Sequence, residues 1–287
     1  MIPAAFEYFA PASVKEAIGL LEKHGDDAKV LAGGHSLLPI MKFRLAQPKV
    51  VVDIGRIPGL DGITVSGTTI AIGALATHDA IERHAALQEK CPLLPAAAAV
   101  IGDMQVRNRG TIGGSLAHAD PAADYPGVML ALDAEIVTTG AKKSRTISAK
   151  DFFVDMLTTA LQPTELITEI RVPALAKGAG TAYLKHAHPA SGYAVVGVAV
   201  VLQVSGGKCQ KAAIGINGVA GKTYRAAAVE KALVGQALDE KSVAAAAAHA
   251  ADGVDAQGDL YASSQFRAHL ASVYTKRAVL LAASRTK

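Results

Sequence analysis

Two glycine-containing segments hold the residues of this sequence that are best suited to chemistry. The first follows a short apolar run and reads Ala32-Gly33-Gly34-His35-Ser36. Glycine lets a backbone N–H approach an anion without a Cβ in the way, and consecutive N–H groups can form an anion-binding nest. The chemistry that this pattern suits is pyrophosphate binding, although the same residues also make an ordinary tight turn.

The second segment contains more glycine, flanked by hydroxyl groups, and reads Gly110-Thr111-Ile112-Gly113-Gly114-Ser115. Asp124 lies shortly after it and could accept a hydrogen bond from a sugar-type hydroxyl. Taken alone, this segment is as typical of a packed glycine loop as of a binding loop. Two such segments in one chain favour a dinucleotide site.

The glycine spacing excludes the commonest nucleotide-binding motifs. Gly33 and Gly34 are adjacent, so the segment is not a Gly-x-Gly-x-x-Gly fingerprint, and it lacks the Gly-Lys-Ser/Thr ending of a Walker loop. A different dinucleotide-binding fold is therefore indicated. No serine and acid are spaced around His35 as a hydrolase triad requires, so we expect His35 to shape the loop.

Composition excludes several other functions. The two cysteines, Cys91 and Cys209, form no Cys-x-x-Cys pair, so we do not expect this chain to hold an iron–sulfur cluster or a structural zinc. A net charge of only +4, 5% aromatic residues and no tryptophan argue against a nucleic-acid partner. No apolar run of about 18 residues and no secretory signal are visible, which predicts a cytoplasmic protein without a membrane span.

The elements that position the two segments alternate between helix and strand. Ser13 and Glu16 form a capping box that starts a helix, and Gly25 is placed to end it. Further elements of the first half are strands over residues 29–32 and 50–54, a hairpin over 63–72, and helices over 78–87 and 95–104.

A different lobe is predicted to begin after Pro173. It contains strands over residues 182–186, 193–204 and 209–215, then helices over 224–233, 241–251 and 264–283. Strands in the first half, followed by strands and then helices, predict an α+β fold with two or three lobes.

Together, the two glycine segments resemble those of the flavin-binding medium subunits in the molybdenum hydroxylase family, which includes xanthine dehydrogenase and aerobic carbon monoxide dehydrogenase. The order and spacing of the segments match, and so do the flanking Gln105-Val106-Arg107-Asn108-Arg109 and Ala119-Asp120-Pro121. The resemblance spans essentially the whole chain. Neither segment alone would be specific, but the pair is.

The resemblance implies a two-lobed FAD-binding domain of the vanillyl-alcohol-oxidase/PCMH type, with lobes over residues 1–57 and 58–175. A C-terminal domain over residues 176–287, with a small antiparallel sheet and helices, would follow. It also implies that this chain carries FAD, while a large subunit holds the molybdenum cofactor and a small subunit holds [2Fe-2S] clusters. The implied assembly is a dimer of heterotrimers that passes electrons to an external acceptor.

The resemblance also implies which residues contact the cofactor. The first loop would clasp the FAD pyrophosphate, the second would wrap the dinucleotide from the other side, and the remaining residues would touch it from neighbouring elements. The implied contacts are Ala32, Gly33, Gly34, His35, Ser36, Ile101, Gly110, Thr111, Gly113, Gly114, Ser115, Asp124, Leu166 or Ile167, Lys185 and Tyr193. None of these residues is expected to be catalytic, and none to bind a metal.

One segment departs from the family pattern. Relatives commonly show Lys-Arg-Lys-x-Gly-Asp-Tyr-Ala where this chain runs from Lys185 through His186 and His188 to Tyr193. The lost basic cluster puts the flavin potential and the electron acceptor in doubt. Two further alternatives remain open: a self-sufficient flavoprotein oxidase of the same fold, and a cofactor-free scaffold. His186-x-His188 would be a metal pair only with a third ligand.

Overall fold

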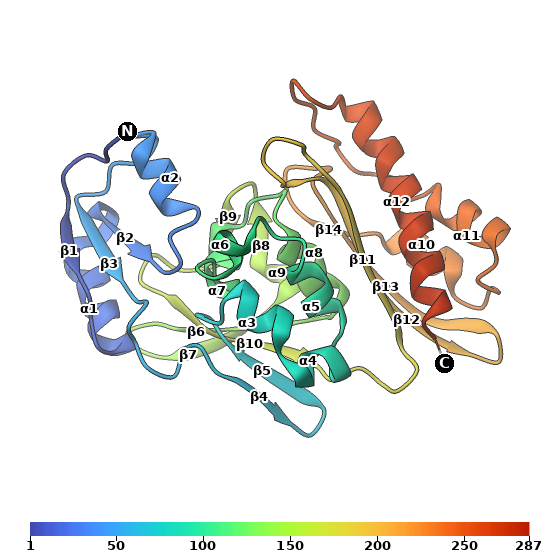
Figure 1. Cartoon of the computed structure of the whole chain (residues 1–287), viewed down its shortest axis with the longest axis horizontal. Coiled ribbons are helices and arrows are strands. Elements are labelled where there is room, and N and C mark those ends of the chain that lie inside the picture. Colours follow the sequence, from blue (N-terminus) through green and yellow to red (C-terminus); the bar gives the residue numbers. More distant parts are fainter. Residues whose placement is uncertain (287) are drawn as a thin grey trace.

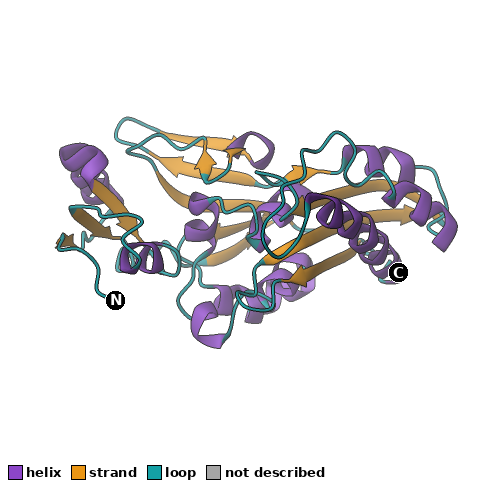
Figure 2. Cartoon of the chain, turned by 90° about the horizontal axis from the view of Figure 1, so that it is seen from above, coloured by secondary structure: helices purple, strands orange, loops and turns teal. Residues whose placement is uncertain are grey.

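Three main β-sheets, each with its own helices, follow one another along the chain (Figure 1). The structure is a computed structural model and describes residues 1–286. The N-terminal sheet lies at one end of the long axis and the C-terminal helices at the other, and the view in Figure 2 shows the same succession. The predicted mixed α+β class is confirmed. The lobe boundaries at residues 57 and 175 stay predictions.

The first sheet is small and parallel, in the order β1 (Glu7–Phe9), β3 (Val50–Asp53), β2 (Ala28–Leu31). Helix α1 (Val14–His24) covers it and buries Ala17, Ile18 and Leu21 against the strands. The predicted serine cap is present, because the Ser13 side chain accepts from the Glu16 amide at 3.2 Å. The Glu16 carboxylate also reaches back, but it accepts from the Ala12 amide at 2.8 Å and not from the Ser13 amide that a capping box uses. A short 3₁₀ turn, η1 (Gly25–Asp27), leads from α1 to β2.

The second sheet has five antiparallel strands: β4 (Ile63–Ser66), β5 (Thr69–Gly73), β10 (Leu166–Pro173), β6 (Glu135–Thr139) and β7 (Ser144–Ser148). Its helices are α3 (His78–Arg83), α4 (Ala85–Lys90), α5 (Leu93–Ala98), α6 (Met104–Arg107), α7 (Ile112–His118), α8 (Asp124–Ala131) and α9 (Ala149–Phe152). A hairpin of β8 (Phe153–Asp155) and β9 (Thr158–Thr159) stands apart from the sheet.

Two predicted helices of this part are interrupted. His84 takes an extended conformation, with φ −71° and ψ 113°, and divides the helix expected over residues 78–87 into α3 and α4. The helix expected over 95–104 begins earlier, at Leu93, and ends at Ala98. Gly102 then has a φ of +51°, a conformation that a helix cannot contain, and Asp103 caps α6.

The third sheet has the order β11 (Gly180–Ala187), β12 (Ala194–Ser205), β13 (Lys208–Asn217), β14 (Tyr224–Arg225). Strand β12 is buried on both faces: Ala199 and Val201 pack toward α8, whereas Val198 and Val200 pack toward α12 (Ser264–Ser284). Helices α10 (Ala227–Leu233) and α11 (Glu240–Ala247) complete the outer layer. Tyr224 and Arg225 form a strand, so the helix expected from residue 224 starts only at Ala227.

Helix α8 joins the second part of the chain to the third sheet by close backbone contact. A Cβ built on Gly215 of β13 would overlap the carbonyl oxygen of Gly127 in α8. A Cβ on Gly127 would in turn lie 2.6 Å from the side-chain oxygen of Asn217. This approach is possible only because both residues are glycine.

We therefore expect Gly215→Ala to lower the free energy of unfolding by about 3 kcal/mol, because an added methyl group must push α8 off the sheet. Gly19→Ala is the matched control: Gly19 lies on the exposed side of α1 with open space around it. Alanine there should raise the stability by about 0.5–1 kcal/mol through helix propensity. Chemical denaturation of both variants measures the difference, and equal stabilities would contradict the packing argument.

Candidate functional site

The two glycine segments, far apart in the sequence, lie against each other in the structure. Strand β2 ends at Leu31 and leads into the first segment. A Cβ added to Gly33 would overlap the carbonyl oxygen of Arg109 and lie 2.8 Å from the Cα of Gly110. The segments thus meet backbone to backbone, which places the predicted residues of both loops at one location.

The first segment presents free backbone donors. Two of its carbonyl groups accept hydrogen bonds near the start of α2 (Leu37–Lys42): Gly34 accepts from the Leu38 amide at 3.0 Å and Ser36 from the Ile40 amide at 3.3 Å. None of the amides of residues 33–36 donates to an acceptor among residues 1–286. Gly34 has a φ of +80°, which a nest of consecutive amides requires. Four half-buried or exposed N–H groups without a protein acceptor fit the oxygens of a pyrophosphate.

The second segment is built differently, because most of its amides are already used by the protein. Ile112 donates to the Ala76 carbonyl at 3.0 Å, Gly113 to the Ala74 carbonyl at 2.8 Å, and Gly114 to the side-chain oxygen of Thr111 at 3.2 Å. A Cβ on Gly113 would lie 2.6 Å from the Ala74 oxygen. Packing against Ala74 therefore accounts for this glycine.

The second segment has fewer backbone amides free to bind a ligand than its glycine content suggests. The Thr111 amide has no acceptor in the described part of the chain, and Thr111 itself is buried. Gly114 and Ser115 are half-buried beside it. The predicted contacts of this segment with a dinucleotide stay predictions, and Thr111 is the residue whose backbone is free to make one.

Asp124, Lys185 and Tyr183 form a buried polar cluster between α8 and β11. The Asp124 carboxylate accepts from the Tyr183 hydroxyl at 2.6 Å and from the Lys185 ammonium at 3.1 Å. The ammonium also donates to the Gly192 carbonyl at 2.9 Å. Burial raises the pKa of the Asp124 carboxyl above its usual range, while Lys185 and Tyr183 act in the opposite direction. Asp124 and Lys185 were predicted as separate flavin contacts, and the structure pairs them with each other.

Tyr183 is not among the site residues that were predicted from the sequence. It lies two residues before Lys185 on β11, and alternate residues of a strand share a face. Tyr183 therefore points toward the same side as Lys185. That alternation is the signal in the sequence that identifies it.

Tyr193 extends from the C-terminal domain toward the first segment. Burial and the nearby carboxylates of Asp120 and Asp124 raise the pKa of its phenol, and the Ser36 hydroxyl beside it lowers it. Tyr193 as a residue remains 41% exposed. All three parts of the chain thus contribute to one location: Ser36 from the first, Asp124 from the second and Tyr193 from the third.

The apolar residues that were predicted to contact the cofactor are buried or half-buried in the protein core. Leu166 and Ile167 are buried in different cores, Leu166 with the first sheet and Ile167 with the second. Ala32 is half-buried against the same core as Leu166, and Ile101 against the same core as Ile167. His35 is exposed. Their roles as cofactor contacts stay predictions.

A buried histidine lies behind the second segment. His78 is the first residue of α3, and a Cβ on Gly110 would lie 2.5 Å from its Nε2 atom. Its ring centre is 5.3 Å from that of Tyr125. Burial lowers the pKa of His78 to about 4, and the nearby side chains of His35 and Arg107 act in the same direction. At neutral pH the imidazole is therefore uncharged.

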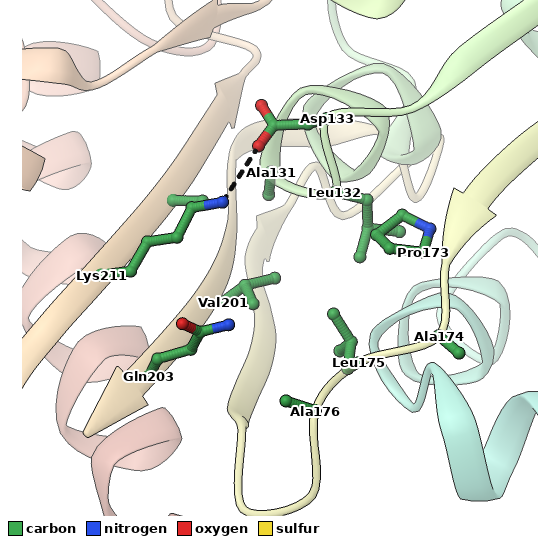
Figure 3. Close-up of a pocket in the computed structure, with 11 residues that line it drawn as sticks. Ala131, Leu132, Asp133, Pro173, Ala174, Leu175, Ala176, Val201, Gln203 and Lys211 are labelled. Carbon is green, nitrogen blue, oxygen red and sulfur yellow. Dashed lines mark ion pairs between the residues drawn. The ribbon is translucent and has the colours of Figure 1, made fainter. Parts of the chain in front are cut away.

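A separate pocket of about 330 Å³ lies between the end of α8, the segment after β10, and strands β12 and β13 (Figure 3). Lys211 and Asp133 form an ion pair at 3.6 Å along one side of it. The predicted flavin contacts, all within the described residues, are not among those that line it. This pocket does not belong to the candidate site.

The His186-x-His188 pair does not form a metal centre. His186 lies beside Tyr274 and Phe266 of α12, whereas the ring of His188 is 4.4 Å from that of Tyr261. Within residues 1–286, no group of three or more potential ligands is placed to hold a metal ion. Among the same residues no helix is long and apolar enough to cross a bilayer.

Comparisons with known proteins agree with this geometry. The family described as the FAD binding domain in molybdopterin dehydrogenase matches residues 4–175, and the CO dehydrogenase flavoprotein C-terminal domain matches residues 181–282. The chain therefore belongs to the family of FAD-binding medium subunits of molybdenum hydroxylases. It is an FAD-binding subunit of an oxidoreductase.

Individual relatives cover the full length. The carbon monoxide dehydrogenase medium chain of Hydrogenophaga pseudoflava is 42% identical over 97% of both chains. The 6-hydroxypseudooxynicotine dehydrogenase complex subunit alpha of Paenarthrobacter nicotinovorans is 39% identical over 100% of this chain and 97% of its own length. A solved structure of the Hydrogenophaga pseudoflava carbon monoxide dehydrogenase that lacks the Mo-pyranopterin moiety matches with a TM-score of 0.98 and 44% identity, covering 100% of both chains.

The uncharged state of His78 predicts a pH dependence of stability. Below about pH 6.5 the unfolded chain binds a proton at this residue, whereas the folded chain does so only near pH 4, so stability falls as the pH drops through this window. Proton binding at His78 in the unfolded chain should lower the free energy of unfolding by about 2 kcal/mol between pH 7 and pH 5. His78→Gln should lose that part of the pH dependence in urea denaturation. An equally steep fall in the variant would show that His78 is not the group responsible.

Proposed function

We propose that this chain is the medium subunit of a cytoplasmic molybdenum hydroxylase, assembled as a dimer of heterotrimers. A large subunit with the molybdenum cofactor would oxidise the substrate, and a small subunit with [2Fe-2S] clusters would deliver the electrons to this chain. The observation that carries the flavin assignment is the run of free amides at residues 33–36, held against the second segment.

In this proposal the residues of the chain bind and orient FAD. The amides of residues 33–36 hold the pyrophosphate, and Thr111 contributes its free amide from the opposite side. Lys185 is held by Asp124 and fixes the Gly192 carbonyl, which directly precedes Tyr193. Tyr193 then lies beside the isoalloxazine. When bound, FAD supplies the redox chemistry, so the chain itself needs no general base.

The substrate is not selected by the residues described here. The matched families are described as an FAD binding domain and as a flavoprotein C-terminal domain, and neither description names an organic substrate. The relatives carry names with unlike substrates, carbon monoxide in one and a nicotine derivative in another. We infer that the substrate is chosen on the large subunit, and that the external acceptor meets the flavin here.

The loop assignment predicts that Gly33→Ala weakens FAD binding by at least about tenfold, because the methyl group must push the first segment away from Arg109. Gly62→Ala is the matched control, since a Cβ at Gly62 meets nothing within 4 Å. Flavin absorbance per purified chain measures retention, and denaturation checks that both variants are folded. Full FAD content in a folded Gly33→Ala variant would contradict the assignment.

Co-purification tests the assembly. A tagged chain, expressed in its own host, should retain a larger molybdenum-containing subunit and a small iron–sulfur subunit in equal amounts, with a mass twice that of one heterotrimer. Metal analysis and mass measurement in solution provide the readouts. If the chain binds FAD but purifies alone and oxidises organic substrates by itself, the self-sufficient oxidase replaces this proposal.

A further inference from the structure

The segment over residues 101–107, which precedes the second glycine segment, is folded back on itself. Gly102 has a φ of +51°, and a Cβ there would lie 2.8 Å from the side chain of Val106. The Asp103 carboxylate accepts from the Val106 amide at 2.8 Å and caps α6. These contacts bring the start and the end of the segment close together.

The guanidinium of Arg107 connects the end of this segment to its start. Its Nη1 atom donates both to the Ile101 carbonyl at 3.3 Å and to the Gly102 carbonyl at 3.2 Å. Its Nε atom lies 2.8 Å from a carboxylate oxygen of Glu82 in α3. The Arg107 side chain is 16% exposed and that of Glu82 28%, so the charge lies mostly inside the protein. One side chain therefore connects two carbonyl groups of the segment to a neighbouring helix.

The same segment leads directly into the contact between the glycine loops. Gly110 donates to the Val106 carbonyl at 2.7 Å, and the Arg109 carbonyl is the group that meets Gly33. The orientation of residues 101–107 therefore sets where the second loop lies against the first. It also sets the position of Ile101, a predicted cofactor contact.

We propose that Arg107 is a positioning residue of the flavin site, acting through the Ile101 and Gly102 carbonyls and through the Arg109–Gly33 contact. This inference rests on the proposed binding of FAD by the two loops. Arginine suits the role because Nε and Nη1 are separate nitrogens of one rigid planar fork: Nε faces the Glu82 carboxylate while Nη1 donates to the two carbonyls. The guanidinium also stays charged when partly buried. A lysine ammonium could keep the attraction to Glu82 but is a single point without the fork.

The test uses the full chain, freed of FAD and titrated with FAD while flavin fluorescence is followed. Arg107→Lys should retain the unfolding midpoint of the FAD-free parent within a few degrees and bind FAD about tenfold more weakly, the scale of one lost charge-assisted hydrogen bond. Arg107→Met should bind FAD more weakly still. Arg83→Met is the control, because Arg83 lies on the same helix as Glu82 and forms an exposed ion pair with Asp79. It should bind FAD as the parent does.

The outcomes separate the inference from the proposal beneath it. If the parent chain does not bind FAD, the proposed flavin site fails. If the parent binds FAD and Arg107→Lys binds it equally well, Arg107 does not position the site. If affinity and the unfolding midpoint of the FAD-free protein fall together in both Arg107 variants, the role of Arg107 is only structural, and the inference is overturned.

Discussion

The backbone contact between Gly33 and the Arg109 carbonyl is the constraint on which the candidate site depends. It joins a loop that follows a parallel strand to a loop from the five-stranded part of the chain. A side chain at Gly33 would separate the two, so the contact fixes both the residue type and the distance between the lobes. With the loops held in this way, the amides of residues 33–36 remain free of protein acceptors. Amides without a protein acceptor can donate to an anionic ligand instead.

A buried ion pair fixes the C-terminal domain to the candidate site. An isolated Lys185 or Asp124 would be costly in the interior, but each completes the hydrogen bonding of the other, with Tyr183 and Gly192 as additional partners. The pair joins α8 to β11, and the close approach of Gly215 to Gly127 joins α8 to β13. The third sheet therefore borders the candidate site on one side. This arrangement places Tyr193 beside Ser36.

Local patterns predicted most strands and the two loops, because strand runs, caps and glycine clusters are encoded by neighbouring residues. What the sequence could not reveal depends on contacts between distant residues. Gly113 has the appearance of a ligand-binding glycine, yet its amide and its lack of a Cβ are both required by Ala74. Asp124 was predicted to face a cofactor, and its hydrogen-bond partners are Tyr183 and Lys185 from a strand of the third sheet, about sixty residues further along the chain. Helix α8 was not predicted at all.

The segment that departs from the family pattern can now be placed. His186 and His188 lie in the segment where relatives commonly carry a basic cluster, and both pack against aromatic rings of the C-terminal part: Tyr274 for the first and Tyr261 for the second. Lys185 is retained, and its side chain points away from them toward Asp124. His186 follows Lys185 on β11 and therefore faces the opposite side of the strand, whereas His188 lies beyond the end of β11, after an irregularity in the pairing with β12 between His186 and Ala187. The departure therefore changes the residues that contact Tyr274 and Tyr261 and leaves the pair of Asp124 and Lys185 in place.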